Sequence, residues 1–141
     1  MKKVVFDTNV LVSAIGWEGP PHGLLEACLH GRLKLYISNT VLLEKLSKVL
    51  ARPKLKVIVG HPDLPVILAW LASLEHIVIP EFEPDVITMD PADNKVLACA
   101  LAAKADAIIS GDDHLLNLRV YNEIKILRAA QAIHALFPGP A

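Results

Sequence analysis

The 141-residue sequence has few of the residues that mark several common classes of protein. Its two cysteines, Cys28 and Cys99, lie inside aliphatic runs without metal-ligand spacing, so we expect neither a disulfide-stapled secreted domain nor a zinc site. No apolar stretch approaches the roughly 18–20 residues that span a bilayer. Asp7 and Asn9 interrupt the apolar N-terminal segment, which argues against a signal peptide. The sequence therefore predicts a cytoplasmic protein with no membrane partner.

The sequence also has none of the familiar motifs for covalent catalysis or nucleotide binding. It contains no GxSxG elbow, no GxGxxG fingerprint and no Walker loop. The six histidines share no common spacing, and neither cysteine has a positioned histidine nearby in the sequence. We therefore expect neither a nucleophilic enzyme nor a nucleotide-cradling loop.

The composition is that of one compact domain, which we expect to cover residues 1–141. The net charge is -1, from 14 basic and 15 acidic residues, but the charges are unevenly placed. Residues 32–56 carry seven basic side chains against one acid, and residues 75–93 carry six acids and no Lys or Arg. These segments are either ordinary solvated faces or a basic region beside an acidic one, which would suit a polyanion bound through a metal.

Short apolar runs alternate with segments of helical periodicity along the whole chain. Strands are predicted at residues 3–6, 35–37, 76–79, 107–110 and 124–127. Helices are predicted at residues 8–15, 22–29, 41–52, 91–103 and after residue 127 through residue 136, with a further apolar segment at residues 63–74. Unalternating strands separated by helices indicate a parallel sheet buried on both faces. The predicted fold class is therefore α/β, a three-layer α/β/α arrangement around a central parallel sheet.

Four carboxylates occupy positions where a structural residue could as easily be neutral. Asp7 follows the first strand, Glu44 lies on the helix predicted at residues 41–52, Asp93 is in the first turn of the Ala-rich helix, and Asp112 follows the strand AIIS. Sites in open parallel sheets lie beyond the carboxyl ends of the strands, which favours Asp7 and Asp112 as site residues. Carboxylates without Cys or His ligands favour the hard cations Mg²⁺ or Mn²⁺ over Zn²⁺.

Each of the first three acids also has a purely structural interpretation. Asp7 can cap the helix that follows it. Glu44 can form an exposed ion pair with Lys48, worth at most about 0.5 kcal/mol. Asp90 and Asp93 have the spacing of a helix cap and its first turn, although capping explains one acid more easily than both.

The segment after the strand AIIS is equally ambiguous. Asp112 and Asp113 follow a glycine and suit an ordinary turn, an interpretation that is strongest for Asp113. His114 is most simply a surface residue beside that turn, and we assign it no role from the sequence.

Three segments, in this order, give the sequence a resemblance to a known family. They are VVFDTNVLVSA, SNTVLLEKLSKVLARPK and DPADNKVLACALAAKADAIISGDDHLL. The sequence resembles the PIN-domain ribonucleases, and among them the VapC-like toxins of prokaryotic toxin–antitoxin systems. The resemblance implies that an acidic quartet binds one or two Mg²⁺ or Mn²⁺ ions: Asp7, Glu44, Asp93 and Asp112. It also implies three supporting polar residues: Thr8, Asn9 and Ser110. Many members carry another acid two residues after the last of the quartet, where this chain has His114, and Asp113 is one residue early for that role.

The implied activity is metal-dependent hydrolysis of RNA phosphodiesters, leaving a 5′-phosphate and a 3′-hydroxyl. The resemblance also implies a homodimer and a small cognate antitoxin protein as partners. Four basic residues on or just after the helix that carries Glu44 are predicted from their spacing and sign to lead the RNA backbone to the site: Lys45, Lys48, Arg52 and Lys54.

Two other functions remain open from the sequence. A non-catalytic PIN-like scaffold would bind RNA or a protein partner while its acids serve as caps and ion pairs. A phosphotransfer receiver or a dehalogenase-like phosphatase would use Asp7 as the phosphoryl acceptor. The phosphatase would have a second Asp two residues later, where this chain has Asn9.

Overall fold

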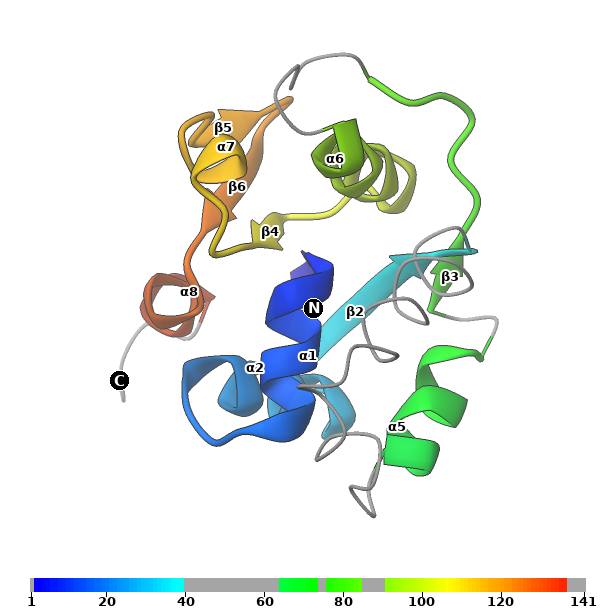
Figure 1. Ribbon diagram of the computed structural model, residues 1–141, viewed down its shortest axis with the longest axis vertical. Helices are drawn as coiled ribbons and strands as arrows, with labels where there is room; N and C mark the ends of the chain where they lie inside the picture. The colour runs from blue at the N-terminus through cyan, green and yellow to red at the C-terminus, as the bar shows by residue number, and fades with distance from the viewer. Residues whose placement is uncertain (1, 40–63, 74–75, 85–90, 137–141) are drawn as a thin grey trace.

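The computed structural model describes residues 2–39, 64–73, 76–84 and 91–136. These form a six-stranded sheet with helices on both faces (Figure 1). The strands are β1 (Lys2–Phe6), β2 (Leu33–Ser38), β3 (Ile77–Val78), β4 (Ala107–Ile109), β5 (Val120–Tyr121) and β6 (Ile124–Leu127). The helices are α1 (Thr8–Gly16), α2 (Pro20–Leu29), α5 (Leu64–Leu71), α6 (Pro91–Ala103), α7 (Asp113–Leu116) and α8 (Ala129–Leu136). The helix predicted at residues 41–52 lies outside the described residues.

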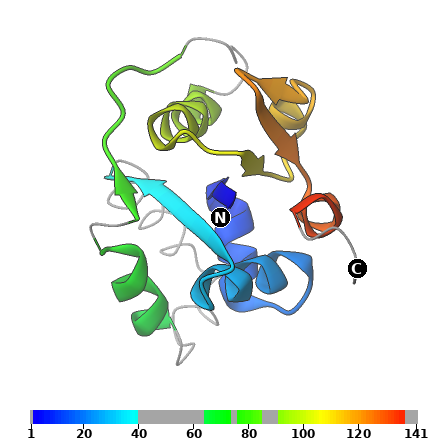
Figure 2. The same cartoon turned by 180° about the vertical axis from the view of Figure 1, so that it is seen from behind.

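The strand order is β3-β2-β1-β4-β6-β5, and every pairing except the last is parallel. Figure 2 shows β3 beside β2 at one edge of the sheet. The predicted parallel sheet is confirmed, with an antiparallel strand β5 added at the other edge. Asn122 and Glu123 form its two-residue turn, and both have positive φ, 48° and 68°. This is the geometry of a tight hairpin, but Asn-Glu lacks the Asn-Gly signal that identifies such turns in a sequence.

Two apolar clusters cover the two faces of the sheet. Val4 and Phe6 of β1 pack with residues of α1, α2, α5 and α8. Val5, which points to the opposite face, packs with residues of α6 and α7. Alternate residues of one strand are thus buried on both sides, which explains why β1 shows no polar alternation. The three-layer α/β/α prediction is confirmed.

Gly31 ends α2 and directs the chain into β2. Its φ of +77° is in the left-handed region, the N–H of Arg32 donates to Ala27 O at 2.8 Å, and the N–H of Gly31 donates to Cys28 O at 3.1 Å. These two bonds form the Schellman motif, in which glycine avoids the strain that a side chain would bring.

The two thiols are core groups, as predicted. Cys28 and Cys99 are buried and unpaired with each other, and burial raises the pKa of each to about 12. Both are therefore protonated and unreactive near neutral pH.

Among the described helices, none has the length and apolar character needed to cross a membrane.

Candidate functional site

The register of two central strands brings Asp7 and Ser110 side by side. Phe6 of β1 is paired with Ile109 of β4, and each strand is followed directly by a polar residue, Asp7 or Ser110. The Asp7 N–H donates to Ile109 O at 3.0 Å, which continues the ladder by one step. The predicted position of Asp7, at the carboxyl end of a central strand, is confirmed.

Asp7 is 5% exposed and uses both carboxylate oxygens in hydrogen bonds. Oδ1 accepts the Val10 N–H at 2.8 Å, so Asp7 is the N-cap of α1. Oδ2 accepts a hydrogen bond from the Ser110 hydroxyl. The capping interpretation therefore accounts for one oxygen, whereas the second is held by a residue 103 positions away.

Ser110 joins Asp7 to Asp112. Its hydroxyl oxygen accepts the Asp112 N–H at 2.9 Å while the same hydroxyl donates to Asp7. Asp112 is in turn the N-cap of the short helix α7, accepting the His114 N–H at 2.8 Å. The Asp112 side chain remains 30% exposed, so its carboxylate is accessible to a ligand.

Asp112 also belongs to a second group, with Asp93 and His114. One side-chain ligand atom from each of these three residues lies within 4.8 Å of the other two. His114 Nδ1 is 3.5 Å from Asp112 Oδ1 and 3.9 Å from Asp93 Oδ2. Asp93, in the first turn of α6, is buried, whereas the His114 side chain is 44% exposed. A buried carboxylate therefore faces an accessible carboxylate and an imidazole.

The donor set and the spacing of this second group fit a divalent cation. Bonds of about 2.0–2.2 Å place neighbouring ligand atoms roughly 3–3.6 Å apart around an ion, so the 3.5 Å pair already has this spacing and the 3.9 Å pair is slightly wider. The three atoms are two carboxylate oxygens and one imidazole nitrogen, all of them common metal ligands. Asp93, Asp112 and His114 would hold the ion, and Asp7 lies beside them through Ser110.

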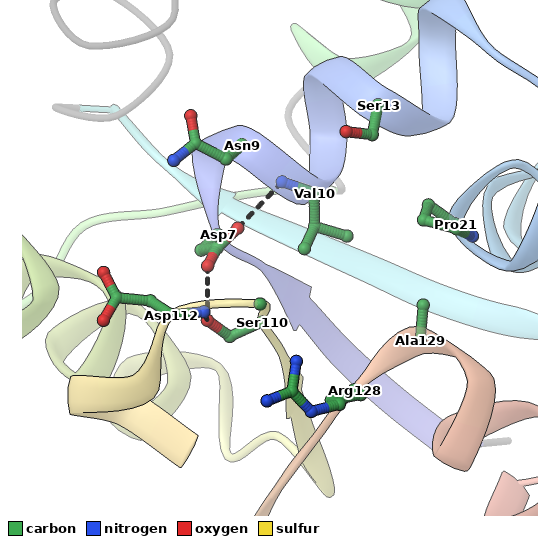
Figure 3. Close-up of a pocket in the computed structure, with 10 residues that line it drawn as sticks. Asp7, Asn9, Val10, Ser13, Pro21, Ser110, Asp112, Arg128 and Ala129 are labelled. Atoms are coloured by element: carbon green, nitrogen blue, oxygen red, sulfur yellow. Dashed lines mark hydrogen bonds between the residues drawn. The ribbon is translucent and has the colours of Figure 1, made fainter. Parts of the chain in front are cut away.

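A cleft of about 510 Å³ opens in front of Asp7, Ser110 and Asp112 (Figure 3). Asn9, the second residue of α1, lies at its rim, and Arg128 enters from the segment between β6 and α8. The remaining lining comes from Val10, Ser13, Pro21, Gly111 and Ala129. The cleft gives a ligand direct access to two of the predicted acids.

The structure thus brings together three of the four predicted acids. Asp7 and Asp112 are joined by Ser110, and Asp93 and Asp112 belong to the group with His114. Glu44 lies outside the described residues, as do Asp90 and the four predicted RNA-binding residues, Lys45, Lys48, Arg52 and Lys54. Of the supporting residues, Ser110 bridges two acids and Asn9 lines the cleft. Thr8 is buried, and its hydroxyl has no hydrogen-bond partner among the described residues.

Two site residues were missed by the sequence reasoning. His114 does not lie apart from the acids as a simple surface residue but faces Asp93 and Asp112. Its position two residues after Asp112, where the resemblance to the PIN-domain ribonucleases implies an acid in many members, was the signal. No sequence signal indicated Arg128, because its place at the cleft depends on the β4–β6 register. Asp113 does not point to the acids; its carboxylate pairs with Arg128 at 3.4 Å.

The chain matches the sequence model of a family described as "PIN domain" over residues 3–114. That range runs from the second residue of β1 to the second residue of α7, and contains all the acids of the site. No curated protein and no solved structure gives a significant match to the chain.

Proposed function

The chain belongs to the PIN-domain family, and we propose that it is a metal-dependent endoribonuclease that hydrolyses RNA phosphodiesters. The family relationship supports nuclease activity in general terms. One observation carries the finer proposal: Asp112 links the cleft-lining pair of Asp7 and Ser110 to the cation-sized group of Asp93 and His114. A phosphate in the cleft would therefore lie next to a divalent cation.

In this proposal, Asp93, Asp112 and His114 hold the cation, Mg²⁺ or Mn²⁺, and Asp7 faces the substrate beside it. When bound there, the cation would supply a lowered pKa for a water and compensation of charge on the phosphoryl oxygens. Ser110 fixes the Asp7 carboxylate toward the cleft, where it can accept a hydrogen bond from the attacking water. Asn9, at the rim, supplies an amide donor for a hydrogen bond to the RNA strand.

The cation has a second consequence for substrate binding. Asp7, Asp93 and Asp112 place negative charge at the edge of the sheet, which repels a phosphodiester. Their charge must be compensated before RNA can enter the cleft. We therefore expect RNA binding itself to require the metal, not only cleavage.

The non-catalytic scaffold is the second candidate, and the caps favour it. Asp7 accepts the Val10 N–H and Asp112 accepts the His114 N–H, so both acids already have structural roles. The phosphoryl-acceptor alternative has less support. The phosphatase would have a second Asp two residues after Asp7, and this chain has Asn9 there.

One experiment separates these functions. Purified protein is incubated with single-stranded RNA with and without Mg²⁺ or Mn²⁺, beside the variants Asp7→Asn and Asp93→Asn. The nuclease predicts metal-dependent cleavage that both variants lose, with 5′-phosphate ends. Binding without cleavage would support the scaffold, and a stable phosphoaspartate at Asp7 would support the phosphoryl-acceptor alternative.

We further propose that the protein is the toxin of a toxin–antitoxin pair, acting in the cytoplasm as a homodimer. The resemblance to VapC-like toxins supports this role, and the two buried, unpaired thiols suit a reducing compartment. A small open reading frame next to the gene would support the pairing. When co-expressed, the product of that reading frame should form a complex with the protein and suppress RNA cleavage. If it neither binds the protein nor suppresses cleavage, the toxin–antitoxin pairing is contradicted.

A further inference from the structure

Arg128 is the one basic side chain among the described residues that line the cleft. The sheet fixes its position: Ile109 of β4 pairs with Leu127 of β6, and the Ser110 N–H donates to Leu127 O at 3.0 Å. The residue after Leu127 therefore lies beside the residue that joins Asp7 to Asp112. Figure 3 shows the guanidinium directed into the cleft, near Ser110.

Arg128 is also a poor choice for its local structure. It directly precedes α8, and its carbonyl oxygen accepts the Ala132 N–H at 2.9 Å, so it is the N-cap residue of that helix. N-caps favour Ser, Thr, Asp or Asn, and the helix dipole disfavours positive charge at this end. The side chain of Gln131 instead reaches back to accept the Arg128 N–H at 3.0 Å. Residues that break local rules in this way are expected at functional sites.

The contact that Arg128 makes in the protein is a weak one. Its Nη2 lies 3.4 Å from Asp113 Oδ1, and the two side chains are 57% and 80% exposed. An exposed pair of this kind contributes little to stability and is easily exchanged for another anion. Asp113 therefore keeps the guanidinium near the mouth of the cleft without occupying its donors permanently.

We propose that Arg128 binds a backbone phosphate of the RNA strand in the cleft, beside Ser110 and the acids that it joins. The inference rests on the proposed function. The guanidinium fork matches two phosphate oxygens, and the first N–H groups of α8 add favourable partial charge at the same end. Arg128 also lies beyond residue 114, where the family match ends, so the resemblance does not supply this role.

Direct binding tests the proposal without relying on cleavage. Fluorescence anisotropy of labelled single-stranded RNA is measured across a salt series with Ca²⁺ in place of Mg²⁺, and gels verify that the RNA stays intact. Arg128→Gln should weaken binding about tenfold. The slope of log K against log[salt] should fall in magnitude by about 0.7, the value for one lost phosphate contact on a single strand.

Two further variants separate the fork from the charge and from a general surface effect. Arg128→Lys should keep the salt slope but lose part of the affinity, because ammonium retains the charge and lacks the fork. Arg119→Gln removes the same charge from an exposed arginine that does not line the cleft, and should bind like the wild-type protein.

The outcomes distinguish failure of this inference from failure of the proposed function. Equal affinities and slopes for Arg128→Gln and Arg119→Gln would overturn the role of Arg128, even if the wild-type protein cleaves RNA. Weaker binding by Arg128→Gln alone, with no cleavage by the wild-type protein in Mg²⁺ or Mn²⁺, would support the phosphate contact and reject the nuclease. No RNA binding by the wild-type protein would overturn both.

Discussion

Ser110→Ala removes the hydroxyl on which the geometry of the site depends. In the structure this hydroxyl donates to Asp7 Oδ2 and accepts the Asp112 N–H at 2.9 Å. Ser110 is 1% exposed, so its hydroxyl is shielded from bulk water although the residue borders the cleft. The variant leaves a buried carboxylate with one donor fewer and an N–H without its acceptor.

The expected cost follows from these two losses. A hydrogen bond to a charged group contributes about 1.5–3 kcal/mol, and a part-buried N–H left unpaired adds up to about 1 kcal/mol. We expect Ser110→Ala to lower the free energy of unfolding by about 2–3 kcal/mol. For 141 residues the unfolding entropy is about 0.3 kcal/mol/K, so Tm should fall by roughly 7–10 °C.

Ser73→Ala is the matched control, measured with it by calorimetry and urea denaturation. The Ser73 hydroxyl oxygen is buried, and it has no hydrogen-bond partner among the described residues. Its removal should leave the free energy of unfolding unchanged or raise it slightly, because a desolvated polar group is lost without a bond. The reasoning is refuted if Ser110→Ala costs no more than Ser73→Ala.

Four other predictions concern the metal, the pH and the cleft. Mn²⁺ at 100 times its Kd should stabilise the wild-type protein by about 2.7 kcal/mol, or roughly 9 °C in Tm, and a similar shift in Asp93→Asn would contradict the assigned ligands. His114→Asp should lower the ratio of the Mg²⁺ Kd to the Mn²⁺ Kd in titration calorimetry, because carboxylate favours Mg²⁺ more than imidazole does; an unchanged ratio would exclude His114 as a ligand. The hydrogen bond between His22 and Ala14 O, with Glu26 nearby, raises the pKa of His22 above 6.5. Its stabilisation, reduced by solvent screening because the side chain is 37% exposed, should be complete below pH 6.5 and lost as the pH rises through the raised pKa, in urea titrations of the wild-type protein but not of His22→Gln. Arg128→Ser should raise the free energy of unfolding by about 0.5–1 kcal/mol while weakening RNA binding, since serine is the better N-cap; a loss of both would indicate a structural role for Arg128.

The periodicity of the sequence predicts most of the sheet and most of the helices around it. Val4, Val5 and Phe6 form an unbroken apolar run because they are buried alternately on two faces. The run therefore indicates a parallel, doubly covered strand, and Asp7 after it indicates the edge where a site forms. The antiparallel strand β5 was missed because its Asn-Glu turn carries no recognisable hairpin signal.

The site was predictable only in part, for a related reason. A sequence shows which acids follow strands, but not which hydrogen bonds join them. That Ser110 would link Asp7 to Asp112 depends on the pairing of Phe6 with Ile109. That His114 would turn toward Asp93 depends on α7 beginning immediately after Asp112. Arg128, 15 residues from Asp113 along the chain, meets it only through the sheet.

The most direct test of the metal site is anomalous diffraction from crystals of the wild-type protein grown with Mn²⁺. We predict a peak about 2.0–2.3 Å from one carboxylate oxygen each of Asp93 and Asp112 and from His114 Nδ1. The absence of a peak at saturating Mn²⁺, or a peak only at other acids, would contradict the account.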